Sequence, residues 1–157
     1  MKPTYTLLHE ISASPTEPLP PSWQSIQLCS MWDGFKELTE GANPKSEDLQ
    51  VCIDTVNLME TFITVKTWRD ASGSTVEILD GDGLLQDAVT ALKKAAARKR
   101  AGHGFRLDGP GIHAVRSIML DYQSLLETLP ARTMVRCLRL TEKELKNQIR
   151  TRKVSVV

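Results

Sequence analysis

The most regularly spaced residues that could do chemistry in this sequence are cations near its C-terminal end. Seven of them follow one another at intervals of four and three positions: Arg132, Arg136, Arg139, Lys143, Lys146, Arg150 and Lys153. In a helix, at about 100° per residue, this spacing places all seven on one narrow line, which we call the basic stripe. Such a line can follow phosphates, meet an acidic protein surface or simply be a solvated helix face. We expect it to face solvent, while Met134, Leu138, Leu145 and Ile149, on another side of the same helix, face the bundle. We take the seven cations as the candidate macromolecule-binding site.

No motif for catalysis, cofactor binding or metal binding is complete. The run of residues 80–83, Asp-Gly-Asp-Gly, begins like a calcium loop, but its sixth and twelfth positions are Leu85 and Ala91, where glycine and glutamate are required. Gly102 and Gly104 lack the third glycine and the preceding strand of a dinucleotide-binding turn. We therefore predict a protein that is not an enzyme, with no catalytic residue, no cofactor, no metal and no small-molecule substrate.

Scattered polar residues leave some alternatives open. His103 and His113 flank one glycine-rich loop but lack a Cys, Asp or Glu at ligand spacing. A Ser–His–Asp or Cys–His group formed only in the fold is not visible in a sequence. Asp54 and Asn57 lie on the polar strip of an otherwise apolar helix, where a structural hydrogen-bond network is favoured over catalysis. Trp23, just after a proline-rich segment, is a candidate anchor for a protein contact.

The elements that must position these residues are helices. Apolar residues recur every three or four positions in five segments, which begin near residues 22, 46, 84, 108 and 131. Glycines or prolines separate the segments, and Ser22, Ser46 and Asp108 are candidate N-caps. The second segment is apolar nearly all round and is expected to be central. The sequence predicts an all-α, single-domain bundle of about five helices, and residues 75–79 are too few to distinguish a strand from a loop.

The bundle is expected to cover residues 22–152. Five of the eight prolines lie in residues 1–21, which predicts an extended, flexible N-terminal arm. Residues 153–157 are expected to be a C-terminal tail. The helices join through short loops, as in antiparallel bundles.

Charge is distributed unevenly along the chain. The net charge is +1, yet residues 1–90 hold 5 basic and 14 acidic residues, and the rest of the chain is correspondingly basic. This asymmetry suggests either docking of the two halves on each other or an electrostatic surface for a partner. The three cysteines, Cys29, Cys52 and Cys137, form no zinc or disulfide pattern and are expected in the core. With no apolar run of about 20 residues or secretory signal, we expect a cytoplasmic protein.

The segment of residues 104–115, Gly-Phe-Arg-Leu-Asp-Gly-Pro-Gly-Ile-His-Ala-Val, precedes an amphipathic helix and a basic tail. It resembles small helical accessory proteins encoded on proteobacterial prophages and plasmids. The resemblance assigns no catalytic residue and implies a mobile-element accessory protein. We therefore expect a binding protein that acts through protein–protein contacts and modulates host machinery. The alternative is a transcriptional regulator that binds duplex DNA through the basic C-terminal helix, and a homo-oligomer is open in both cases.

Overall fold

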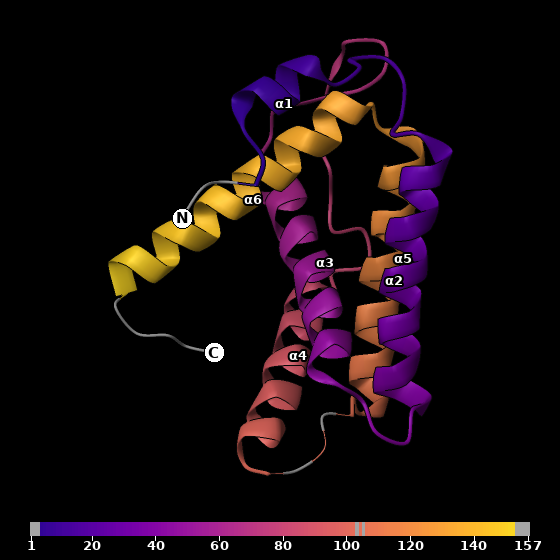
Figure 1. Cartoon of the computed structure of the whole chain (residues 1–157), viewed down its shortest axis with the longest axis vertical. Coiled ribbons are helices and arrows are strands. Elements are labelled where there is room, and N and C mark those ends of the chain that lie inside the picture. Colours follow the sequence, from indigo (N-terminus) through magenta and orange to yellow (C-terminus); the bar gives the residue numbers. More distant parts are fainter. Residues whose placement is uncertain (1–3, 103, 105, 153–157) are drawn as a thin grey trace.

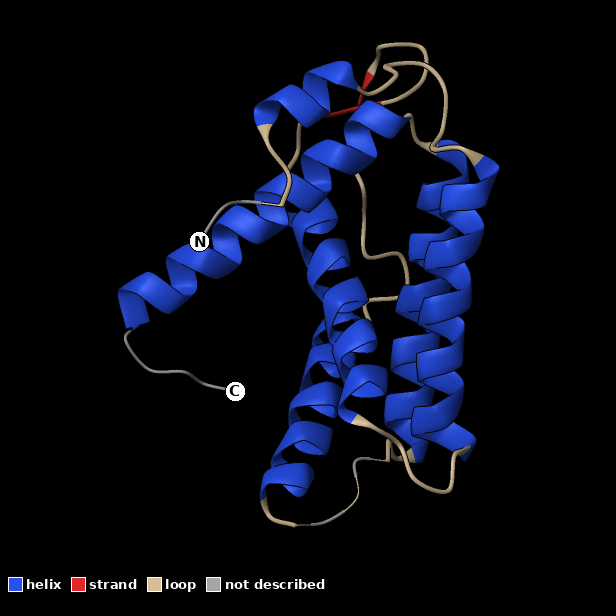
Figure 2. Ribbon diagram, in the orientation of Figure 1, coloured by secondary structure: helices blue, strands red, loops and turns tan. Residues whose placement is uncertain are grey.

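The computed structural model describes residues 4–102, 104 and 106–152. This part of the chain is mostly helical, as predicted, with six helices and one small antiparallel sheet (Figure 2). The elements are α1 (Leu7–Ser12), α2 (Pro21–Glu40), α3 (Ser46–Thr64), β1 (Trp68–Arg69), β2 (Thr75–Val76), α4 (Leu85–Arg100), α5 (Gly109–Thr128) and α6 (Ala131–Arg152). The helix that the sequence did not predict is α1, which lies within the expected arm.

Helices α2 to α5 form an antiparallel four-helix bundle, and α6 crosses one end of it (Figure 1). The central position predicted for the second apolar segment is confirmed, since α3 packs against α2, α4, α5 and α6. Its β-branched end stays helical as far as Thr64. A helix that is apolar nearly all round can pack against several neighbouring helices at once, which explains why α3 lies at the centre of the bundle.

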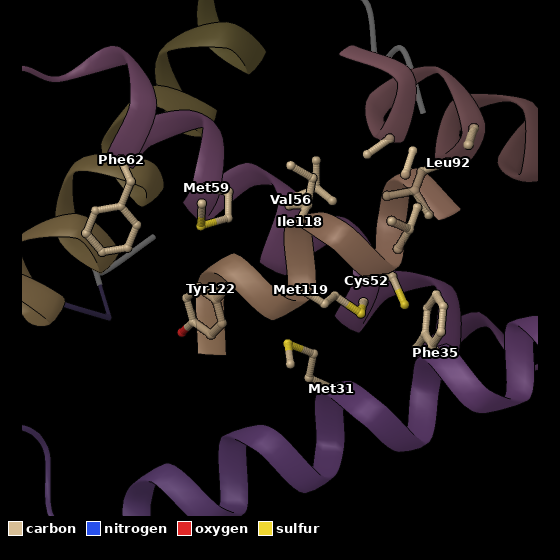
Figure 3. Packing of buried hydrophobic residues seen from close by; sticks show 14 of the residues in the cluster. Met31, Phe35, Cys52, Val56, Met59, Phe62, Leu92, Ile118, Met119 and Tyr122 are labelled. Carbon is tan, nitrogen blue, oxygen red and sulfur yellow. The ribbon is translucent and has the colours of Figure 1, made fainter. Parts of the chain in front are cut away.

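The core is built from the apolar faces that the periodicity indicated. Figure 3 shows side chains of α2, α3, α4 and α5 converging between the helices. Gly34 of α2 lets that helix approach α3 closely, because a Cβ there would lie 3.1 Å from the Asp48 carbonyl oxygen and would collide with Val51. The core includes Met31, Phe35, Cys52, Val56, Met59, Phe62, Leu92, Ile118, Met119 and Tyr122.

Two of the three predicted N-caps, Ser22 and Ser46, are wrong. Helix α2 begins at Pro21, where a missing N–H costs nothing in the first turn, and not after Ser22. Helix α3 begins at Ser46 itself, and the Asp48 carboxylate accepts a hydrogen bond from the Lys45 N–H at 2.8 Å. The third prediction is confirmed, because the Asp108 side chain caps α5 by accepting from the Gly111 N–H at 2.7 Å.

A small hairpin links α3 to α4. Trp68 pairs with Val76 and Arg69 with Thr75, so a strand forms at residues 75–76 of the undecided segment 75–79. The Asp70 carboxylate holds the turn by accepting from the backbone N–H groups of Ser72 and Ser74. Trp68 is fully buried, its ring centroid is 4.9 Å from that of Phe62, and its Nε1–H donates to the Phe62 carbonyl at 2.8 Å. The hairpin therefore closes the end of the bundle on which α6 lies.

The N-terminal segment differs from the expected extended arm. In residues 4–20 the structure has α1, whose first turn is capped reciprocally by Thr6 and His9. The segment lies along α6, and Glu17 and Ser14 accept backbone hydrogen bonds from the first residues of that helix, at 2.7 and 2.8 Å. Prolines remove N–H donors from this segment but leave its carbonyl groups free to accept hydrogen bonds. The contacts with α6 use the carbonyl groups of Ser14 and Glu17. The predicted C-terminal tail, residues 153–157, lies outside the described residues.

Candidate macromolecule-binding surface

The basic stripe lies on α6, and its first half is covered by the chain itself. Arg132 donates from Nε to the Ala13 carbonyl at 3.1 Å and from Nη2 to the Ile11 carbonyl at 2.8 Å. The Arg139 guanidinium forms an ion pair with the Glu10 carboxylate at 3.0 Å, and both side chains are largely shielded from solvent. Two arginines of the stripe therefore bind the N-terminal segment, which lies on the side of α6 opposite to the bundle (Figure 1).

Glu142 extends this contact by one turn of α6. Its carboxylate accepts from the Thr4 N–H at 2.6 Å and from the Tyr5 N–H at 3.0 Å, and Lys146 of the stripe pairs with it at 3.3 Å. These hydrogen bonds, that from Thr4 foremost, lower the pKa of Glu142 because they stabilise the carboxylate form. One acid thus holds the start of the described chain and neutralises a cation of the stripe.

Arg136 faces a different neighbour. Its guanidinium donates to the Thr67 carbonyl at 2.8 Å and to the Thr67 hydroxyl at 3.0 Å, and its central carbon lies 5.0 Å from the centroid of the Trp68 ring. A cation over an indole face at this distance is attracted by the ring quadrupole. Arg136 therefore fixes the hairpin under α6.

The expectation of an unbroken cationic ridge in solvent is thus wrong for four of the seven positions. Among the described residues, Lys143 is exposed and takes part in none of the hydrogen bonds or ion pairs found. The side chain of Arg150 and all of Lys153 lie outside the described part of the chain. Sequence reasoning identified the stripe but not its acceptors, which are three backbone carbonyls, one hydroxyl and two carboxylates.

The apolar face of α6 shows a second difference. Met134, Leu138, Leu145 and Ile149 continue one line along the helix and were expected to face the bundle. Met134 is 1% exposed, but Leu145 is 36% and Ile149 73% exposed. Figure 2 shows the reason: the last turns of α6 project beyond the bundle, so its apolar face continues past the helices that would cover it. Helix α1 also has exposed apolar residues, Leu7, Leu8 and Ile11, but it lies on the other side of α6.

The remaining candidate residues lie apart from the basic stripe, on α3, before α4 and on α5. The Asp54 carboxyl group lies at the protein surface and accepts a hydrogen bond from Gln50 at 2.8 Å; partial loss of water around it raises its pKa. The Asp80 carboxylate accepts from the N–H groups of Leu84 and Leu85 at the start of α4. His113 is exposed on α5, and His103 lies outside the described residues. Within the described part, no three His, Cys, Asp or Glu side chains gather in a way that would hold a metal ion.

The structure also locates the three cysteines and Trp23. Cys52 and Cys137 are buried core residues, as expected, and burial raises the pKa of the Cys52 thiol to about 12. Cys29, expected in the core, is exposed on α2, because its position falls beside the line of Leu28 and Met31. Trp23 is 54% exposed at the start of α2, where a contact residue would be accessible.

A second cationic surface escaped the sequence reasoning as a site. The last two turns of α4 and the following loop hold Lys93, Lys94, Arg98, Lys99, Arg100 and Arg106, and residues 91–107 include no Asp or Glu. Five of these side chains, at positions 93, 94, 99, 100 and 106, are exposed, and Arg98 is half-buried. A shallow groove between α3 and α4 lies beside them and is lined by Ser46, Leu49, Gln50, Ile53, Ala96, Lys99 and Arg100.

None of the helices in the described part is both long and apolar enough to span a membrane. Comparisons with models of protein families, with curated proteins and with solved structures found no match to this chain.

Proposed function

We propose that this chain is a non-enzymatic helical binding protein that acts through protein–protein contacts, with the projecting end of α6 as its contact surface. The observation that carries this proposal is that the apolar face of α6 is buried at Met134 and open at Leu145 and Ile149. Single apolar residues on a protein surface are common, but these two continue a core-facing line on one helix. A projecting amphipathic helix is a usual ligand for an apolar groove in another protein.

The resemblance to accessory proteins of phages and plasmids leads us to propose a host protein as the partner. Complete burial of a fully exposed side chain of this size contributes about 1.5–3 kcal/mol, and Leu145 is 36% and Ile149 73% exposed, so covering both contributes about 2–3 kcal/mol. This is about a third of the free energy of a micromolar complex, which is about 8 kcal/mol, and other contacts with the partner supply the rest.

The test compares the double variant Leu145→Asp/Ile149→Asp with a control of equal charge, Leu79→Asp/Leu120→Asp, whose residues are also exposed but lie away from α6. Tagged protein is recovered from host cells, and purified protein is examined by sedimentation velocity. We expect a partner at defined stoichiometry with the parent and the control, and at least tenfold weaker association with the α6 variant. A parent that sediments as a lone monomer and recovers no partner would refute the proposal, as would equal association of both variants.

DNA binding through the basic stripe, the alternative, has less support. Arg132, Arg136 and Arg139 already donate hydrogen bonds to Ile11, Ala13, Thr67 and Glu10 of the same chain. A phosphate would compete with these acceptors for the same guanidinium groups.

A further inference from the structure

The C-terminal half of α4 carries a cationic surface that the proposed protein-binding role does not use. We infer that this surface binds the phosphate backbone of duplex nucleic acid without sequence preference. The inference is independent of the role of α6, because the two surfaces share no residue.

The cations in the C-terminal half of α4 lie on two neighbouring lines of the helix. At about 100° per residue, Lys93 and Arg100 fall on one line of α4, and Lys94 and Arg98 fall on a second line. The strip between these lines holds the small residues Thr90, Ala97 and Ala101. Seven residues of helix span roughly 10 Å, so the face offers four cations over several phosphate spacings. Small side chains between them allow a backbone to approach closely.

The exposed cations of this surface are not used in ion pairs within the described chain. None of the ion pairs found in the described part includes Lys93, Lys94 or Arg100, and all three side chains are exposed. This differs from the basic stripe of α6, where the chain supplies acceptors to three arginines.

The helix dipole explains only some of the cations on α4. Cations at a helix C-terminus interact favourably with the helix dipole, but this effect fades beyond the last turn. It accounts for Arg98, Lys99 and Arg100. Lys93 and Lys94 lie about two turns before the end of α4, so the dipole does not explain them.

The residues around the cations of α4 indicate which class of molecule this surface binds. The large exposed apolar residues of the described chain all lie outside residues 85–108. Protein interfaces have apolar or aromatic anchors at their centre, and membrane-binding helices need an apolar face, so both fit this surface poorly. Helix α4 also lacks the aromatic residues on which single-stranded bases stack. Duplex backbone, which requires only cations and close approach, fits best.

The experiment is fluorescence anisotropy of the full chain with two labelled 20-base-pair duplexes of unrelated sequence, from about 50 to 200 mM salt. Neutralising Lys93→Gln/Lys94→Gln/Arg100→Gln is compared with Lys36→Gln/Lys66→Gln/Arg69→Gln, which changes the net charge equally at exposed positions elsewhere. We expect the parent to bind both duplexes with a slope of log affinity against log salt of about −3 to −4, from about 0.9 per phosphate contact. The α4 variant should lose at least tenfold in affinity at about 50 mM salt, with a slope shallower by about 2.7, while the control keeps the parent's slope.

Three results would overturn the inference. One is that the parent fails to bind duplex at about 50 mM salt. Another is that both triple variants lose affinity equally, since net charge alone would then account for binding. The last is that a polyglutamate peptide or anionic lipid vesicles compete as well as unlabelled duplex. Circular dichroism of each variant verifies that the helices remain folded.

Discussion

Arg136 connects residues that lie far apart in the sequence. Its hydrogen bonds reach Thr67 and its guanidinium covers Trp68, 69 and 68 positions earlier in the chain. The periodicity of α6 places Arg136 on a line of cations and indicates a surface residue. It contains no signal for the acceptor, because a backbone carbonyl is present at every position of any sequence.

We predict that Arg136→Met destabilises the fold, whereas Lys143→Met does not. The first substitution keeps an aliphatic stem but removes two hydrogen bonds from a charged group and the cation–ring contact, a loss of about 1–2 kcal/mol. Lys143 makes none of the hydrogen bonds or ion pairs found in the described part, so its loss should stay within about 0.5 kcal/mol. Urea denaturation measures both. Equal midpoints for the two variants would show that Arg136 is only a solvated cation.

Asp108 and Cys29 show what local patterns can and cannot predict at this scale. The cap by Asp108 could be read from the sequence because donor and acceptor lie three residues apart. The exposure of Cys29 could not be predicted, because a small residue beside the apolar line of a helix can be either buried or exposed. Local hydrogen bonds are encoded locally, and burial depends on the neighbouring helix.

Helix α1 and its contact with α6 illustrate the same limit at the scale of elements. The four apolar faces of the bundle were predictable, since a period of 3.6 residues is a property of each segment alone. The docking of α1 was not predictable, because Glu10 and Arg139 are 129 positions apart in the sequence. The helix itself has only six residues, and the proline-rich composition around it indicated an extended segment. Docking of the two halves on each other was one of the two interpretations of the charge asymmetry, and the ion pair between Glu10 and Arg139 is a place where the halves meet.

Replacing Glu142 tests how α1 is held. We predict that Glu142→Ala accelerates amide hydrogen exchange in residues 7–13 by roughly three- to tenfold at pH 6, because the hydrogen bonds from Thr4 and Tyr5 are lost. The factor is modest because the site is close to solvent. Glu144→Ala, two residues further along and exposed, should leave these rates unchanged.

The pH dependence of this contact follows from the lowered pKa of Glu142. Its carboxylate form is favoured when folded, so the stabilisation is present above the ordinary carboxyl pKa of 4.5 and is lost as the pH falls through the lower folded value. The difference in exchange between the parent and Glu142→Ala should therefore shrink as the solution is acidified from pH 6. A difference that grows on acidification would contradict the role assigned to the carboxylate.

At the scale of the whole molecule, the bundle ends before α6 does. The amphipathic pattern of α6 runs evenly from Met134 to Ile149, and nothing in the pattern marks where the covering helices stop. That point is set by the length of α3, on whose end α6 lies, and by the angle at which α6 crosses it (Figure 1). Both are properties of the assembled fold, which is why the sequence placed Leu145 and Ile149 against the bundle.

The same truncation should therefore have very different costs along this one line of α6. Met134→Ala removes a side chain that is 1% exposed and should destabilise the fold by about 2–4 kcal/mol, since a cavity remains among its neighbours. Ile149→Ala removes one that is 73% exposed and should change the free energy of unfolding by less than about 0.5 kcal/mol, or raise it slightly, because alanine favours helix more than isoleucine does. Chemical denaturation at protein concentrations low enough to prevent association measures both. A large cost at Ile149 under those conditions would mean that the end of α6 is covered by its own chain, and the surface proposed for a partner would not exist.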